Sequence, residues 1–147
     1  MSGFPGTAPS LADIEGLGRI AFQSIPWELR QHAQDVLIRV EDFPDDETED
    51  EMELESPFDL LGLYRGVSML HKSVADPSPH MDMIFLYRRP ILDLWCESGD
   101  ELLHIVRHVL IHEIGHHFGL SDDDMERLEE EADTAEATAA VADLPRA

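Results

Sequence analysis

Residues 112–122 have the sequence HEIGHHFGLSD, which contains three histidines, one glutamate and one aspartate. His112 and His116 are four positions apart, so on a helix both imidazoles lie on one face and can bind one metal ion. Glu113 lies about 100° further round the same helix, where its carboxylate can reach a water on that ion without ligating the ion. The pattern therefore predicts a metal site with a general base beside it.

A third metal ligand is expected just after this helix. A catalytic zinc site uses three protein ligands and leaves a fourth position open for water. Gly119 is typical of a residue that ends a helix and lets the chain turn back, and three positions later Asp122 offers a carboxylate. The complete pattern, H-E-x-x-H-x-x-G-x-x-D, predicts Asp122 as the third ligand, with Asp123 and Asp124 as alternatives. Ligands of these types favour zinc.

Other histidines surround the motif. His104 and His108 continue the four-residue row, so the pair His108 and His112 could also bind an ion. That pair lacks a glutamate after its first histidine and a ligand in a following turn, so His108 is expected to support a ligand or to lie on a solvated face. His117 lies about 100° beyond His116 and is expected to pack or to hydrogen-bond to the backbone. Residues that could stabilise an oxyanion, or simply line a strand surface, are Tyr64, Arg65 and Tyr87.

The remaining sequence alternates between helical and strand patterns. Apolar residues at helical spacing predict helices, and short β-branched or aromatic runs predict strands, of which 36–40 should be buried. Pro90 ends the last strand and indicates an edge position, because proline cannot donate a hydrogen bond to a neighbouring strand. The expected helices are 11–21, 27–34, 98–118 and 122–140, and the expected strands are 36–40, 60–69 and 83–89.

Acidic residues dominate the composition. The chain contains 32 Asp and Glu against 10 Lys and Arg, which gives a formal net charge of −22. This charge repels nucleic-acid phosphates and anionic lipids and favours cations and basic polypeptides, so no nucleic-acid or membrane partner is expected. Residues 41–56 carry ten of the acids and are predicted to form a solvated acidic loop. Such a loop is either a simple insertion or a tract that collects metals or a basic partner.

The length of 147 residues fits one domain, 1–147, with residues 1–9 as a disordered tail. A single cysteine, Cys96, excludes an intramolecular disulfide and fits a reducing compartment. The Gly- and Pro-rich N-terminus lacks the features of a signal peptide, and no apolar run is long enough to cross a membrane. A cytoplasmic protein is expected, and its oligomeric state is left open.

Four segments together carry a resemblance to one family. They are HEIGHHFGLSDDDM at 112–125, LGLYRGV at 61–67, the strand at 84–90 and Val106–His108. With the helix and strand around Pro26, they make roughly residues 11–130 similar to the minimal zincins, a family of small bacterial zincin-like metallopeptidases. The acidic stretch 44–56 departs from the family pattern, so the resemblance implies no role for it.

The resemblance implies both a fold and a chemistry. The fold is α+β, with a minimal zincin-like core in which a small mixed sheet packs beside the active-site helix. The cofactor is Zn²⁺, and the activity is that of a peptidase. The metal ligands are His112, His116 and Asp122, and Glu113 is the catalytic base.

The leading functional hypothesis is a zinc-dependent metallopeptidase that hydrolyses peptide bonds through a zinc-bound water activated by Glu113. An extended peptide could pair with Ile84–Tyr87 if that edge borders the cleft, and the acidic surroundings favour a basic peptide or protein substrate. The alternative is a non-catalytic zinc-binding protein whose acidic surface binds a basic protein partner, and a third possibility is an acidic binding module without metal. Structural zinc sites usually have four protein ligands, so three ligands beside a glutamate favour catalysis.

Overall fold

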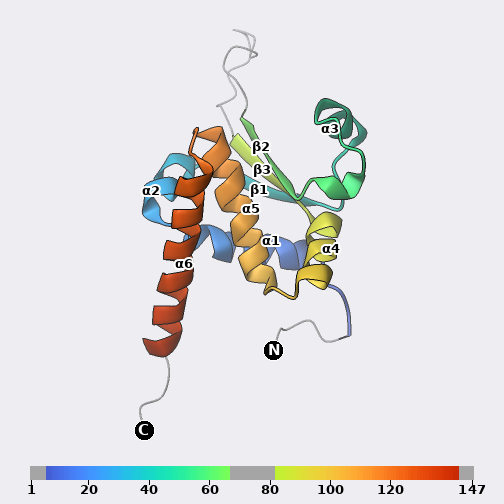
Figure 1. The fold of residues 1–147 in the computed structure, drawn as a ribbon. Coiled ribbons are helices and arrows are strands. Elements are labelled where there is room, and N and C mark those ends of the chain that lie inside the picture. Colours follow the sequence, from blue (N-terminus) through green and yellow to red (C-terminus); the bar gives the residue numbers. More distant parts are fainter. Residues whose placement is uncertain (1–5, 67–81, 143–147) are drawn as a thin grey trace.

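The computed structural model describes residues 6–66 and 82–142, which form several helices and a small mixed sheet (Figure 1). This architecture confirms the predicted α+β class, and α3 and α4 are helices that the sequence patterns did not predict. Residues 1–5 of the expected tail and 67–69 of an expected strand lie outside the described residues. In chain order the elements are α1 (Leu11–Gln23), α2 (Trp27–Arg30), the 3₁₀ helix η1 (Gln31–Ala33), β1 (Leu37–Glu41), α3 (Asp46–Glu51), the 3₁₀ helix η2 (Pro57–Asp59), β2 (Gly62–Gly66), β3 (Asp82–Tyr87), α4 (Arg88–Ser98), α5 (Leu102–His117) and α6 (Asp122–Ala142).

The sheet has the strand order β1-β3-β2, with β1 parallel and β2 antiparallel to β3. β3 is therefore the central strand, and its Ile84 and Leu86 are fully buried. The predicted edge position of this strand is wrong, and Ile84–Tyr87 offers no free edge to a substrate. Pro90 does not belong to the strand. It lies in the first turn of α4, where backbone N–H groups have no partner in the helix and proline is tolerated.

β1 is an edge strand, not the buried strand that its β-branched residues predicted. Leu37 is 45% exposed, and no residue of the strand is fully buried. The strand is covered by α1, which begins where Ser10 and Asp13 cap each other. β1 therefore forms one edge of the sheet, and β2, the strand that borders α5, forms the opposite edge.

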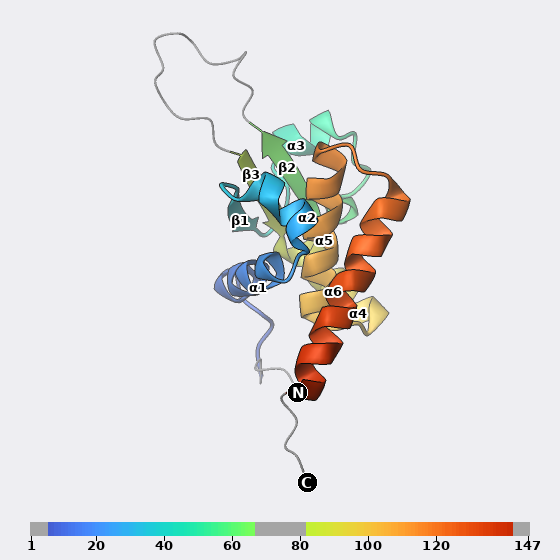
Figure 2. The same cartoon turned by 90° about the vertical axis from the view of Figure 1, so that its left-hand side faces the viewer.

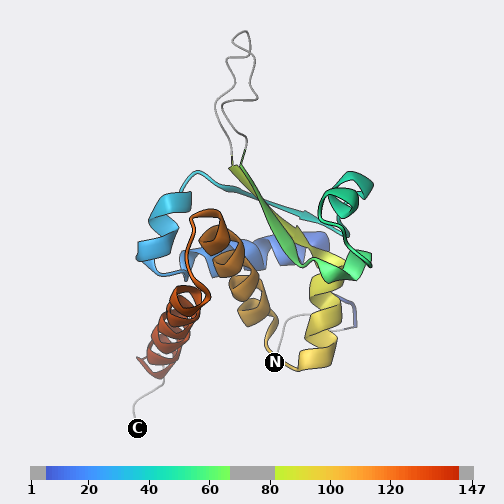
Figure 3. The same ribbon diagram turned by 45° about the horizontal axis from the view of Figure 1, so that its top comes forward.

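α5 is the central helix of the molecule, with α4 and α6 on opposite sides of it (Figure 3). Its apolar residues, such as Val106, Leu110 and Ile114, are fully buried. β2 approaches α5 closely at Gly62, where an added Cβ would lie 2.6 Å from Cγ1 of Val109. This close approach brings the backbone of β2 beside the motif on α5. Among the helices of the described ranges, none combines the length and apolarity needed to span a bilayer.

The acidic segment is more ordered than predicted. The expected loop at 41–56 contains α3, whose first turn is acidic and is capped by Asp45, which accepts a hydrogen bond of 2.7 Å from the backbone N–H of Thr48. Acids in the first turn are stabilised by the helix dipole, so the composition that suggested a loop also suits a helix start. Arg65 of β2 fixes the segment, because its guanidinium donates to Thr48 Oγ1 at 3.0 Å and to Glu51 at 2.9 Å.

Candidate metal site

The turn between α5 and α6 is built as the sequence predicted. Gly119 has φ +77°, a left-handed conformation that favours glycine. The N–H of Leu120 donates to the carbonyl of Gly115 at 2.9 Å and closes the end of the helix. After this turn α6 runs back beside α5 (Figure 2), and the fully buried Met125 packs against α5 at Gly115.

Two rows of side chains face each other across α5 and α6. The row on α5 repeats every four residues and consists of His104, His108, His112 and His116. The facing row on α6 consists of Asp122, Glu129, Asp133 and Glu136. Because the helices run in opposite directions, the start of α6 meets the end of α5. The motif therefore lies at one end of a longer histidine–carboxylate interface.

The predicted metal ligands lie near one another without forming a closed group. The rings of His112 and His116 have centroids 5.7 Å apart and are steeply inclined, at 75°. Asp122 Oδ1 lies 3.8 Å from His116 Nε2, and its side chain is highly exposed. His112 faces Glu129 instead, with 3.7 Å between His112 Nε2 and Glu129 Oε2. Two imidazoles and a carboxylate are a donor set that fits zinc, and the assignment of Asp122 stays a prediction.

His112 and His108 differ in electrostatic environment. Burial and the neighbouring His108 lower the pKa of His112, which favours the neutral imidazole that binds metals. By contrast, the hydrogen bond to Glu129 raises the pKa of His108. The two rings are stacked at a tilt with centroids 4.1 Å apart. His108 is thus a direct neighbour of a predicted ligand and also lies on a solvated face, so both of the expected alternatives remain open.

Glu113 lies on the other flank of α5, beside β2. Its Oε1 accepts a hydrogen bond of 3.3 Å from the backbone N–H of Tyr64. Burial raises the pKa of the Glu113 carboxyl above its ordinary 4.5, and the bond from Tyr64 opposes part of this rise. An effective general base has a pKa near the working pH, so a raised pKa makes a carboxylate a better base near neutral pH. The position and environment of Glu113 suit the role predicted for it.

Of the three oxyanion candidates, Tyr64 is the one beside Glu113. Its hydroxyl donates to Asp82 Oδ2 at 2.5 Å, and burial together with Asp82 raises the pKa of Tyr64, which keeps the phenol protonated. His117 stacks on Tyr64 with 3.9 Å between ring centroids, which confirms that His117 packs. Tyr87 is buried, which raises its pKa to about 12, and Arg65 is engaged by α3.

Sequence reasoning missed Glu129. Its signal was present, because acids recur at helical spacing along one face of α6, opposite the histidine row of α5. The register between the two helices, which pairs Glu129 with His108 and His112, follows from the length of the turn and the burial of Met125. That register is a tertiary property that spacing alone did not reveal.

Comparison with known proteins identifies the family of the chain. No curated protein matches the chain. A family model described as zincin-like metallopeptidase matches residues 33–132, a range that runs from the end of η1 to the middle of α6 and includes the whole motif. The matched range covers most of the chain and holds the sheet, α5 and the histidine–carboxylate interface described above. The chain therefore belongs to the zincin-like metallopeptidase family.

Proposed function

We propose that this protein is a zinc peptidase of the HExxHxxGxxD type. The observation that carries the proposal is the placement of Glu113, half-buried and bonded to β2, on the helix that also presents His112 and His116. His112, His116 and Asp122 would hold the zinc. When bound, zinc lowers the pKa of a water and polarises a substrate carbonyl.

Glu113 would take a proton from the attacking water and pass it to the leaving amine. Its hydrogen bond to the N–H of Tyr64 limits its rotamers and aims it from the side of β2. The phenol of Tyr64 is held by Asp82 and stacked on His117, so it forms a rigid wall beside the base. These contacts organise the reacting groups before a substrate arrives.

The substrate would extend β2. The N–H of Tyr87 donates to the carbonyl of Leu61, and alternate residues of an antiparallel pair share such bonds. Leu61 and Leu63 therefore bond toward β3, whereas Gly62, Tyr64 and Gly66 turn their backbone groups outward. Because Gly62 is buried against α5 and the N–H of Tyr64 is bonded to Glu113, a peptide would pair with the exposed end of this edge at Gly66. The negative charge of the chain favours basic sequences.

The alternative is a non-catalytic zinc protein that binds a basic partner. The acids of α3 and the three consecutive acids at the start of α6 favour this alternative, because they are largely exposed. The single cysteine, Cys96, is exposed and fits a reducing compartment. It therefore supports a cytoplasmic location for either of the two proposed functions.

The deciding experiment compares Glu113→Gln with Glu130→Gln, an exposed acid on α6. Metal content is measured by mass spectrometry, and cleavage is measured with a peptide library. Glu113→Gln should keep its zinc and lose about 10²–10⁴-fold in cleavage rate, whereas Glu130→Gln should match the wild type. Equal cleavage by the wild type and Glu113→Gln would reject the catalytic role of Glu113. A zinc-loaded wild type that cleaves no peptide would favour the non-catalytic alternative.

A further inference from the structure

Two three-residue groups on α5 and α6 have donor atoms within 4.8 Å of one another, counted over the described ranges. One consists of His108, His112 and Glu129, and the other of His104, Asp133 and Glu136. Neither group is the predicted set of His112, His116 and Asp122. Each group is therefore a separate candidate cation site.

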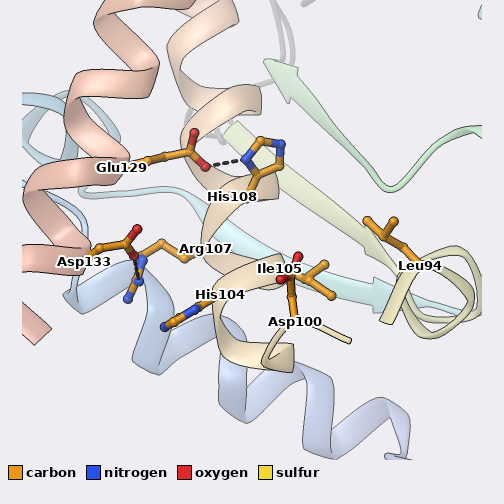
Figure 4. A pocket seen from close by; sticks show the side chains of 8 residues that line it. All are labelled: Leu94, Asp100, His104, Ile105, Arg107, His108, Glu129 and Asp133. Atoms are coloured by element: carbon orange, nitrogen blue, oxygen red, sulfur yellow. Dashed lines mark hydrogen bonds and ion pairs between the residues drawn. The ribbon is translucent and has the colours of Figure 1, made fainter. Parts of the chain in front are cut away.

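The group around His104 already contains a cation. The buried Arg107 donates to Asp133 Oδ1 at 2.5 Å (Figure 4), and its Nη1 lies 3.5 Å from Glu136 Oε1. A guanidinium cannot lose its charge in a protein, so a metal ion here would meet a fixed positive charge. His104 completes the network through a bond of 2.6 Å to Glu136. We assign this group a structural role.

The group around His108 contains no permanent cation. Glu129 directs one oxygen to His108 Nδ1 and the other to His112 Nε2, the latter at 3.7 Å (Figure 4 shows the first contact). Within the described residues, no lysine or arginine forms an ion pair with Glu129. Both rings are partly exposed, and so is the carboxylate, so an ion has access from solvent.

We propose that His108, His112 and Glu129 form a second position for a divalent transition-metal ion, adjoining the catalytic position and sharing His112 with it. Two imidazoles and a carboxylate are suited to zinc, cobalt or nickel. The acidic chain concentrates such ions near its surface.

Sharing His112 makes the two positions mutually exclusive, a consequence that rests on the proposed catalytic site. Nε2 of His112 faces Glu129, and one ring nitrogen binds one ion at a time. An ion held by His108 and Glu129 lies toward α6, whereas Glu113 is bonded to β2 on the opposite flank. A metal ion in the second position is therefore bound away from Glu113, the proposed general base.

The test uses Co²⁺ alone, titrated into the metal-free full chain, with visible absorption and calorimetry as readouts. His116→Ala disables the catalytic position and leaves the second one intact. This variant should bind one Co²⁺ per chain. Adding His108→Ala or Glu129→Gln to it should weaken binding by at least about tenfold. The matched control, His104→Ala in the same background, should bind as His116→Ala alone does.

No Co²⁺ binding by His116→Ala, in a protein whose circular dichroism is unchanged, would overturn the proposal. Equal binding with and without His108 and Glu129 would also overturn it. Asp122→Asn in place of His116→Ala repeats the test with a different disabling change. Failure of the catalytic proposal gives a different result. If no catalytic position exists, the wild type binds Co²⁺ through the second position alone. His108→Ala should then bind Co²⁺ far more weakly than the wild type does.

Discussion

Both ends of the α5–α6 interface pair histidines with carboxylates, but only one end also contains an arginine among these residues. At the end near His104, the carboxylates of Asp133 and Glu136 are held by the buried Arg107. At the end near His116, the ion-pair partners of Asp122 and Glu129 within the described residues are histidines. A permanent cation therefore separates a structural histidine–carboxylate cluster from one that can accept a metal ion.

The two ends differ in whether the positively charged side chain can lose its proton. A histidine near neutral pH can give up its proton and become a metal ligand. Arginine keeps its charge and occupies the carboxylates that a metal would need. Arg107 also approaches Ser24 at the end of α1, with 3.4 Å between its Nη1 and the Ser24 hydroxyl. It thereby connects three helices, and the end of the interface near His104 contributes to stability.

The largest expected effect separates the two ends by metal affinity. In a His108→Ala background, which removes the proposed second position, Asp122→Asn should lower zinc affinity by more than about 100-fold, because losing a ligand costs more than losing a supporting residue. Asp133→Asn, the same change at the end near His104, should leave zinc affinity unchanged. Competition with a chromophoric chelator measures both. Unchanged zinc affinity in Asp122→Asn would show that Asp122 is not the third ligand. Asp123→Asn and Asp124→Asn would then be measured in the same way.

A smaller effect is expected from removing the permanent cation. Arg107→Met keeps apolar volume but leaves Asp133 and Glu136 without their guanidinium. It should lower the free energy of unfolding by about 2–3 kcal/mol, less than for a fully buried pair because both carboxylates reach solvent. Urea denaturation measures this loss. If the comparison is right, the variant should also gain weak Co²⁺ binding that depends on His104, and wild-type stability would contradict the role given to Arg107.

The smallest effect is a pH dependence at Glu136. The hydrogen bond from His104 and the charge of Arg107 hold the pKa of Glu136 below its ordinary 4.5. A lowered pKa stabilises the fold above the unfolded value, and this stabilisation is lost as the pH falls through the folded value. The stability difference between wild type and Glu136→Gln should therefore shrink from about pH 5 to about pH 3. Because the side chain is partly exposed, we expect less than about 1 kcal/mol, and a constant difference would show that the pair does not titrate with folding.

The motif and its turn were predictable from sequence because they depend on local spacing. His112 and His116 had to share a helix face, and Gly119 had to end the helix. The remaining features depend on tertiary arrangement. The central position of β3 follows from strand order, and the pairing of Glu129 with His108 follows from the register of two helices.

The acidic segment shows the same division between local and tertiary information. Its composition correctly indicated exposure, because most of its side chains face solvent. It did not indicate α3, whose stability depends on the cap at Asp45 and on Arg65, a residue of a strand further along the chain. Charge density alone therefore predicted solvation and missed the contacts that order the backbone.

The parallel pairing of β1 with β3 has a consequence for the order of folding. It joins Leu37 to Met83, with β2 lying between them in sequence, so the sheet closes only after a long loop has been brought together. α5, the turn and α6 are adjacent in sequence and can pair much sooner. All the proposed metal ligands lie in this helical hairpin, whereas Glu113 is bonded to β2 of the sheet. During folding the chain would therefore acquire the ability to bind metal before the ability to use it.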